Sequence, residues 1–188
     1  NDFFGQPKPQ WKARLAEVRE GGFRACFNQG INVRVITKEI AEELAAVDYR
    51  DDSFTHRRIY TAWDSLGDER LFFRGVDLLE AAGVRPSHLM VYMLVGYDPA
   101  ETWATIFHRF NAMVDRRIRP FPMVYGDRTR TVPLGGLNAD IGGRRLMDFQ
   151  RWVNTGLYRR SVDFAAYDNA TRRDPLFKAQ GSLFGEAA

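Results

Sequence analysis

The stretch His88-Leu-Met-Val-Tyr-Met-Leu-Val-Gly-Tyr-Asp-Pro-Ala-Glu-Thr102 decides the fold. Its segment Leu89–Val95 is an almost unbroken apolar run of strand length, which indicates a parallel strand covered on both faces. A Gly-Tyr pair then turns the chain. Asp98 suits a helix N-cap and Pro99 the first helical position, with Glu101 placed for a capping box. The stretch predicts a strand, a loop and a helix, with the loop at the strand's carboxyl end, where α/β proteins place their chemistry.

Similar strand-helix units lie on both sides of this stretch. Further strands are predicted over residues 23–28, 58–63 and 119–125, and helices over 11–20, from Thr37, from Asp68, over 99–117 and over 144–157. Residues 49–58 are expected to be a connection, and Pro120 and Pro122 place the last strand at a sheet edge or barrel end. Residues 126–142 are rich in Gly, Arg and Thr and are expected to form a long loop, with the character of a lid.

The predicted class is α/β with four parallel strands, each followed by a helix. Four strands cannot close a barrel, and the first would present an unprotected edge. The sequence therefore resembles the carboxyl-terminal portion of a larger (β/α) domain, formed by residues 1–158, with 159–188 as a partly ordered tail. A complete four-stranded open sheet is the alternative.

Composition limits the function classes. The chain has 188 residues, of which 45% are hydrophobic, and this is enough for a packed core. Cys26 is the only cysteine, so an intrachain disulfide and an all-cysteine metal site within this chain are excluded. No apolar run approaches membrane-spanning length and no signal-like core is present, which favours a cytoplasmic protein. The first residue is Asn1, which favours a processed protein or a fragment.

Charge is distributed unevenly along the chain. Residues 1–108 carry 13 basic and 16 acidic side chains, whereas residues 109–173 carry 13 basic and 6 acidic ones. An Arg-rich half can form a phosphate or nucleic-acid surface, but dispersed arginines are also common on solvated helix faces. The alternative function is therefore a cluster-free (β/α) module that binds nucleic acid through its basic second half.

Polar residues gather at the predicted carboxyl ends of the strands. They form a hydrogen-bonding rim with little acid–base machinery, and no phosphate loop or nucleophile elbow accompanies them. An ordinary (β/α) enzyme could use Asp64 and Asp98 as acid and base if their carboxylates share a cleft. The rim consists of Asp2, Asn28, Gln29, Asn32, Arg34, Asp64, Ser65, Tyr97, Asp98 and Tyr125.

Five strand-end segments in order resemble the later strands of a radical S-adenosylmethionine (SAM) protein. The resemblance covers roughly residues 1–158. The segments are Asn1-Asp-Phe-Phe-Gly5, Phe27-Asn-Gln-Gly-Ile-Asn-Val-Arg34, Tyr60-Thr-Ala-Trp-Asp64, Tyr92-Met-Leu-Val-Gly-Tyr-Asp-Pro-Ala-Glu-Thr102 and Met123-Val-Tyr125.

The resemblance implies a partial (β/α)6 TIM-like barrel with parallel strands, of which about four β/α units are present here. Such enzymes bind SAM at a 4Fe–4S cluster, held by a CxxxCxxC loop after the first strand, and cleave it reductively to a 5′-deoxyadenosyl radical. An electron donor such as flavodoxin or ferredoxin is implied as a partner. The substrate is unknown.

The first two segments match cofactor-binding positions of the family. Asp2 lies where the family contacts the SAM amino group. Arg34 is expected to pair with the SAM carboxylate, because a guanidinium fork suits that group. Asn28 and Asn32, in the same strand-end segment, are included among the expected cofactor-binding residues.

The later segments match positions around the nucleoside. Asp64 and Ser65 match the strand end that binds ribose or the methionine moiety. Gly96 matches the glycine motif near adenine, where a missing side chain permits close approach. Val124 and Tyr125 match the last-strand backbone that borders adenine. Without the resemblance, Gly96 is a turn residue.

One departure from the family is large, because this chain contains no CxxxCxxC motif. The cluster loop is expected upstream of Asn1, so that the chain would be a fragment of a radical SAM enzyme and inactive by itself. The other interpretation is a degenerate relative that binds no cluster.

Overall fold

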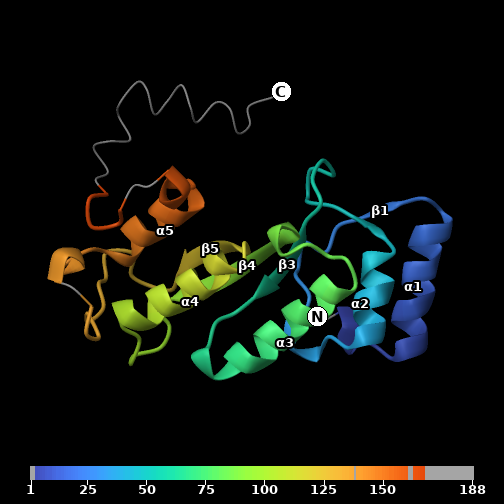
Figure 1. The fold of residues 1–188 in the computed structure, drawn as a ribbon, viewed down its shortest axis with the longest axis horizontal. Coiled ribbons are helices and arrows are strands. Elements are labelled where there is room, and N and C mark those ends of the chain that lie inside the picture. Colours follow the sequence, from blue (N-terminus) through green and yellow to red (C-terminus); the bar gives the residue numbers. More distant parts are fainter. Residues whose placement is uncertain (1–2, 138, 161–162, 168–188) are drawn as a thin grey trace.

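The computed structural model describes residues 3–137, 139–160 and 163–167, which form α-helices and short parallel strands (Figure 1). The helices within these residues are α1 (Lys8–Glu20), α2 (Lys38–Ala45), α3 (Glu69–Ala81), α4 (Trp103–Asp115) and α5 (Leu146–Asn154). The strands are β1 (Arg24–Ala25), β2 (Asp48–Tyr49), β3 (Ile59–Ala62), β4 (Leu89–Val95) and β5 (Arg119–Val124).

A three-stranded parallel sheet forms the centre, in the order β3-β4-β5. Consecutive strands are neighbours, and α3 and α4 make the two crossovers. Such crossovers are nearly always right-handed, which puts the helices of successive units on the same side of the sheet. Figure 1 shows α3 and α4 together in front of the strands. The α/β class with parallel strands is therefore confirmed, and the described strands do not close into a barrel.

The central strand has the predicted bounds but only one fully buried face. Leu89, Val91, Met93 and Val95 are completely buried, whereas the alternating residues of β4 are half-exposed. The prediction that both faces are covered was therefore wrong for the described residues. An apolar run indicates that its residues are unfavourable in water. It does not indicate whether a helix covers the second face of the strand or whether that face stays partly exposed.

Strand β5 lies at a sheet edge, as its two prolines predicted. Helix α5 packs along this edge and supplies hydrogen-bond partners to its backbone. Gln150 Oε1 accepts a hydrogen bond from the Val124 N–H at 3.1 Å, and Asn154 Nδ2 donates one to the Pro122 carbonyl at 3.1 Å. Helix α5 therefore provides hydrogen-bond partners for backbone groups of β5. At an uncovered edge, these groups would bind water or pair with another chain.

The amino-terminal strands form a separate pair, which corrects the prediction of four strands in one sheet. The predicted strand 23–28 is reduced to β1, which pairs parallel to β2, and β2 reaches one residue into the predicted connection 49–58. The loop after β1 nevertheless lies against β3, where the Ile31 N–H donates to the Tyr60 carbonyl at 2.8 Å. Irregular chain thus occupies the edge of β3 where a further regular strand was expected.

Helix starts were predicted with mixed success. Thr37 caps α2 as expected, because its hydroxyl accepts a hydrogen bond from the Ile40 N–H at 3.3 Å. The expected cap by Asp98 and Pro99 was wrong, since α4 begins at Trp103 and is capped by Thr102. The Thr102 and Thr105 side chains form the capping box there. Asp98 instead accepts a hydrogen bond from the Ala100 N–H within a turn, and Glu101 is buried.

Aromatic packing joins α4 and α5 to the chain that follows them. Trp103, Phe107, Phe149 and Trp152 form a ring cluster, and Phe164 inserts into it with ring centroids 5.3–5.8 Å from all four. The described part of the predicted tail 159–188 thus contributes to the core. Residues 161–162 and 168–188 lie outside the described residues.

Loop 126–142 is also held to the domain. The Trp103 N–H donates to the Pro133 carbonyl at 2.8 Å, and the Arg130 guanidinium donates to the Gly96 carbonyl at 2.7 Å. A short 3-10 helix, Ala139–Ile141, interrupts the loop. These contacts give the loop a fixed place beside the carboxyl end of β4.

Candidate cofactor site at the carboxyl-terminal rim

The carboxyl ends of β3, β4 and β5 form a rim that brings together Asp64, Gly96 and Tyr125. Asp64 follows β3, and its Oδ1 accepts a hydrogen bond from the Leu94 N–H at 2.8 Å. The Tyr125 N–H donates to the Val95 carbonyl at 2.9 Å. Parallel strands in register place their ends at the same edge, so residues far apart in sequence become neighbours.

Gly96 is required by the turn and by the contact with α5. Its φ of +81° is a left-handed conformation that favours glycine, and a Cβ there would lie 2.7 Å from Leu146 Cδ1. The Gly96 N–H donates to the Glu101 carboxylate, and its carbonyl accepts from Arg130. These contacts are a sufficient structural reason for glycine, and its proximity to adenine stays a prediction.

A buried ion pair between Glu101 and Arg109 stabilises the rim from within. Arg109 is only 2% exposed and donates to the carbonyls of Trp63, Asp64 and Leu94 at 3.0–3.1 Å, in addition to the Glu101 carboxylate. Burial raises the pKa of Glu101 and lowers the pKa of Arg109, against their mutual attraction. This pair was not predicted from the sequence. The i, i+8 spacing of two charges in an otherwise apolar region was the available signal.

Two tyrosines project from the rim into solvent. Tyr97 is 63% exposed and Tyr125 is 53% exposed, and their rings meet edge to face at a centroid distance of 5.0 Å. Exposed aromatic rings at a strand end offer a stacking surface for a planar ligand.

The open sheet face continues the rim with apolar and aromatic side chains. Tyr60 stacks on Tyr92 at 6.0 Å, and Phe121 meets Tyr92 edge to face at 5.7 Å. Burial raises the pKa of the Tyr92 hydroxyl, and the nearby Asp52 carboxylate and Cys26 thiol raise it further. Cys26 and Asp52 therefore lie near Tyr92, although they line different cavities.

Arg34 is engaged by its own chain. Its guanidinium pairs with Asp68 at 2.7 Å and its Nε donates to Asn32 Oδ1 at 3.1 Å. Asn32 also accepts a hydrogen bond from the Arg34 N–H, at the start of a short 3-10 helix. Ser65 similarly accepts from the Gly67 N–H at 3.2 Å. Asp2 lies outside the described residues.

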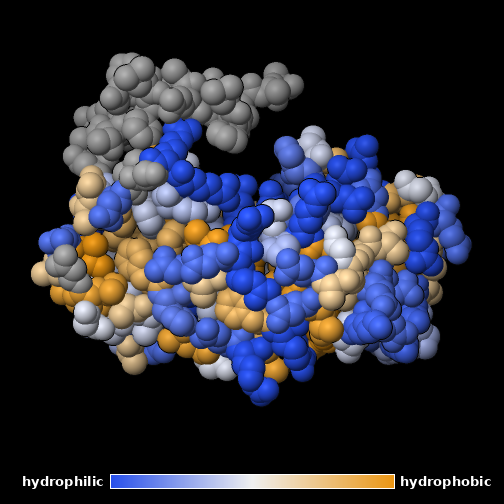
Figure 2. All heavy atoms as spheres, viewed as in Figure 1, coloured by the Kyte–Doolittle hydropathy of each residue, from blue (hydrophilic) through white to orange (hydrophobic). Residues whose placement is uncertain are grey.

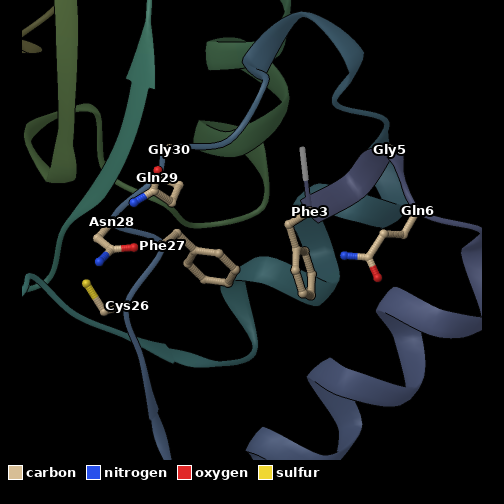
Figure 3. A pocket seen from close by; sticks show the side chains of 8 residues that line it. All are labelled: Phe3, Gly5, Gln6, Cys26, Phe27, Asn28, Gln29 and Gly30. Carbon is tan, nitrogen blue, oxygen red and sulfur yellow. The ribbon is translucent and has the colours of Figure 1, made fainter. Parts of the chain in front are cut away.

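Asn28 lines a separate hollow between β1 and the start of the chain. Its volume is about 550 Å³, and in Figure 3 the rings of Phe3 and Phe27 lie between Gln6 on one side and the side chains of Cys26 and Asn28 on the other. Burial raises the pKa of the Cys26 thiol, which disfavours the thiolate nucleophile. The hollow is lined by Phe3, Gly5, Gln6, Cys26, Phe27, Asn28, Gln29 and Gly30.

Asp64 and Asp98 do not form an acid–base pair in either cavity described here. Each carboxylate accepts a backbone N–H, from Leu94 and from Ala100 respectively. Neither residue lines the hollow at Asn28 or the second cavity, which has a volume of about 690 Å³ and opens near residues 153–160.

Part of the basic second half serves the fold itself. Arg144 donates to the carbonyls of Ala165 and Tyr167, and Arg145 pairs with Asp148 at 3.0 Å. Arg159 and Arg160 instead line the second cavity. The arginines therefore do not act as one surface, and a nucleic-acid role stays a prediction.

Comparison of the chain with protein-family models, with curated proteins and with solved structures finds no match. No helix in the part of the chain that the structure describes is long and apolar enough to cross a membrane. Within residues 3–137, 139–160 and 163–167, no three His, Cys, Asp or Glu side chains are grouped to hold a metal ion.

Proposed function

We propose that this chain is the carboxyl-terminal part of a radical SAM barrel and that its rim contributes to the SAM site. The observation that carries the proposal is the sheet itself. Its consecutive parallel strands have α3 and α4 on one side and a half-exposed row of Tyr92, Leu94 and their neighbours on the other. This arrangement suits a barrel wall, because the inner face of a barrel is completed by further strands.

The polar and aromatic groups at the rim fit a nucleoside. Asp64 uses Oδ1 for Leu94, while its Oδ2 makes no hydrogen bond with the described residues and is available to ribose hydroxyls. Tyr97 and Tyr125 offer exposed rings beside it for an adenine. Ser65, adjacent to Asp64, supplies a second exposed polar side chain.

The methionine end of SAM falls to the other side of the rim. Arg34 is exposed enough to reach a carboxylate while its pairing with Asp68 holds the guanidinium in place. Asn32 would supply a neutral hydrogen-bonding group beside Arg34, and Asn28 would supply one from the hollow next to β1. Val124 would border the adenine through its backbone. When bound together, SAM and a 4Fe–4S cluster supply a 5′-deoxyadenosyl radical that abstracts a substrate hydrogen.

The cluster ligands must come from outside this chain, because three cysteines are needed and Cys26 is the only one. The part described here would bind and orient SAM, and its apolar open face would exclude water from the reacting groups. Flavodoxin or ferredoxin is the class of electron donor that this function requires.

The test uses the product of the complete reading frame, purified without oxygen. We expect about four irons per chain and release of 5′-deoxyadenosine from SAM after reduction with dithionite. Asp64→Asn keeps an acceptor for the Leu94 N–H but removes a charged acceptor for ribose, so the Kd for SAM should rise roughly tenfold.

Asp115→Asn is the matched control, because Asp115 is an exposed carboxylate at the end of α4, away from the rim. Its SAM affinity should equal that of the unaltered protein. A product that binds no iron and no SAM would refute the proposed function. Equal effects of the two substitutions would refute the assignment of Asp64.

A further inference from the structure

The second cavity lies at the amino-terminal end of the sheet, opposite the rim. Its floor is one row of the open face, since Tyr60 pairs in register with Met90, and Met90 with Arg119. One wall is the connection around Asp51 and Asp52, and the other is the chain from the end of α5 to Arg160. Figure 2 shows hydrophilic residues on the surface between these two segments, above the strands.

Guanidinium groups reach this cavity from three different segments. Arg58 directly precedes β3, Arg119 begins β5, and Arg159 belongs to the short 3-10 helix after α5. Like charges held together inside a partly enclosed space are costly unless an anion compensates them. This repulsion affects Arg58: burial lowers the pKa of its guanidinium, and the neighbouring charges of Arg119 and Arg159 lower it further.

These arginines are only partly engaged by the described residues. Arg119 is half-buried and donates no hydrogen bond to any of them. Arg58 makes one contact, to the Ser87 carbonyl at 3.3 Å, and Arg159 donates to the Tyr158 hydroxyl at 2.9 Å through Nε alone. Several N–H donors in the cavity therefore lack an acceptor from the described part of the chain.

The carboxylates in the cavity wall neutralise this cluster only in part. Asp51 accepts hydrogen bonds from Ser53, Thr55 and His56 within its own loop, and its charge offsets only part of the positive charge around Arg58, whose pKa stays lowered. Asp52 is exposed at the cavity edge. Arg58, Arg119 and Arg159 outnumber the two aspartates of the lining, which leaves an excess of positive charge among these side chains.

We propose that this cavity binds the phosphate group of a small molecule through Arg58, Arg119 and Arg159. A phosphate has enough oxygens to accept hydrogen bonds from guanidinium groups on two walls at once, which a carboxylate with two oxygens does less well. A volume of about 690 Å³ accommodates a ligand larger than phosphate itself. The site is separate from the rim, and it does not depend on SAM binding there.

The experiment titrates the product of the complete reading frame with inorganic pyrophosphate by calorimetry, in low salt, and repeats the titration with sodium acetate. We expect saturable binding of one pyrophosphate per chain and no saturable binding of acetate. Arg119→Ala should weaken pyrophosphate binding at least tenfold, and Arg119→Lys should weaken it less, because the charge is kept but the fork is lost.

Two further variants separate a site from a general charge effect and from misfolding. Arg159→Ala changes an exposed residue on the opposite wall and should also weaken binding, even if Arg119→Ala impairs folding. Arg128→Ala removes an exposed arginine from loop 126–142, outside the cavity, and should leave the Kd unchanged. Absence of saturable pyrophosphate binding, or equal weakening by Arg128→Ala and Arg159→Ala, would overturn the proposal.

Discussion

Replacing Arg109 with methionine should destabilise the protein more than any other single change at the rim. The guanidinium joins the ends of β3 and β4 by donating to the carbonyls of Trp63, Asp64 and Leu94, and it neutralises Glu101. Methionine fills a similar space but donates nothing. Three carbonyls then lose a donor, and the buried carboxylate loses its cation.

The expected loss of folding free energy comes mainly from the Glu101 carboxylate, and less from the three backbone carbonyls. Removing one partner of a buried ion pair costs about 3–5 kcal/mol, because it leaves an uncompensated charge in a poorly solvated place. This is a large share of the roughly 5–15 kcal/mol by which a domain is usually stable. Glu101 can limit the loss by taking up a proton, since burial already raises its pKa.

The assay is urea denaturation followed by tryptophan fluorescence, with Trp63 and Trp103 as buried reporters. Arg70→Met is the matched control, because Arg70 is an exposed arginine of α3. Arg109→Met should lower the denaturation midpoint strongly at a constant m-value, and Arg70→Met should not.

The pH dependence provides a second readout. Burial already raises the folded pKa of Glu101 in the unaltered protein, and Arg109 opposes this rise. Removing Arg109 therefore raises the folded pKa further, so protonation stabilises the folded variant more than the unaltered protein. The deficit relative to the unaltered protein should therefore shrink as the pH falls from about 8 to about 5.5. A loss below about 1 kcal/mol with no dependence on pH would refute the argument that Glu101 is held as a buried charge by Arg109.

Three further substitutions test local features. Burial opposes ionisation of Asp51, but its hydrogen bonds outweigh burial and lower its pKa to about 2. Asp51→Asn should therefore lower the free energy of unfolding by about 2 kcal/mol near pH 7. In urea denaturation, this difference from the unaltered protein should disappear as the pH falls from about 5 through 2. Gly75→Ala should lower the thermal midpoint despite the better helix propensity of alanine, because its Cβ would overlap the Val33 carbonyl oxygen, and an unchanged midpoint would contradict this packing. Thr102→Ala should cost about 1 kcal/mol in urea and Asp98→Ala less than about 0.5, and the reverse order would mean that α4 begins where the sequence suggested.

The sequence was enough to predict which residues lie at strand ends in the candidate site. It was not enough to predict which of these residues contact one another. Asp64 and Gly96 were placed at the rim correctly, because a buried apolar run followed by a turn marks a strand end. The engagement of Arg34 by Asp68 was not foreseen, since the two residues are 34 positions apart and only the fold brings them together. Arg109 was overlooked for a related reason, because three of its partners, Trp63, Asp64 and Leu94, come from the ends of β3 and β4, which only the fold brings to α4.

The sequence by itself determined the α/β class, the bounds of β4, the edge position of β5 and the cap at Thr37. Each follows from interactions between residues close in the chain: an apolar run, a proline that cannot donate, a hydroxyl three residues from a free N–H. Only the tertiary structure decided that β1 pairs with β2 instead of extending the central sheet, and that one face of β4 stays open. It also decided that Arg58, Arg119 and Arg159 share a cavity. Such contacts join residues that are far apart in the chain. Their energies depend on which surfaces stay exposed after the other elements have packed, and a local sequence pattern does not contain that information.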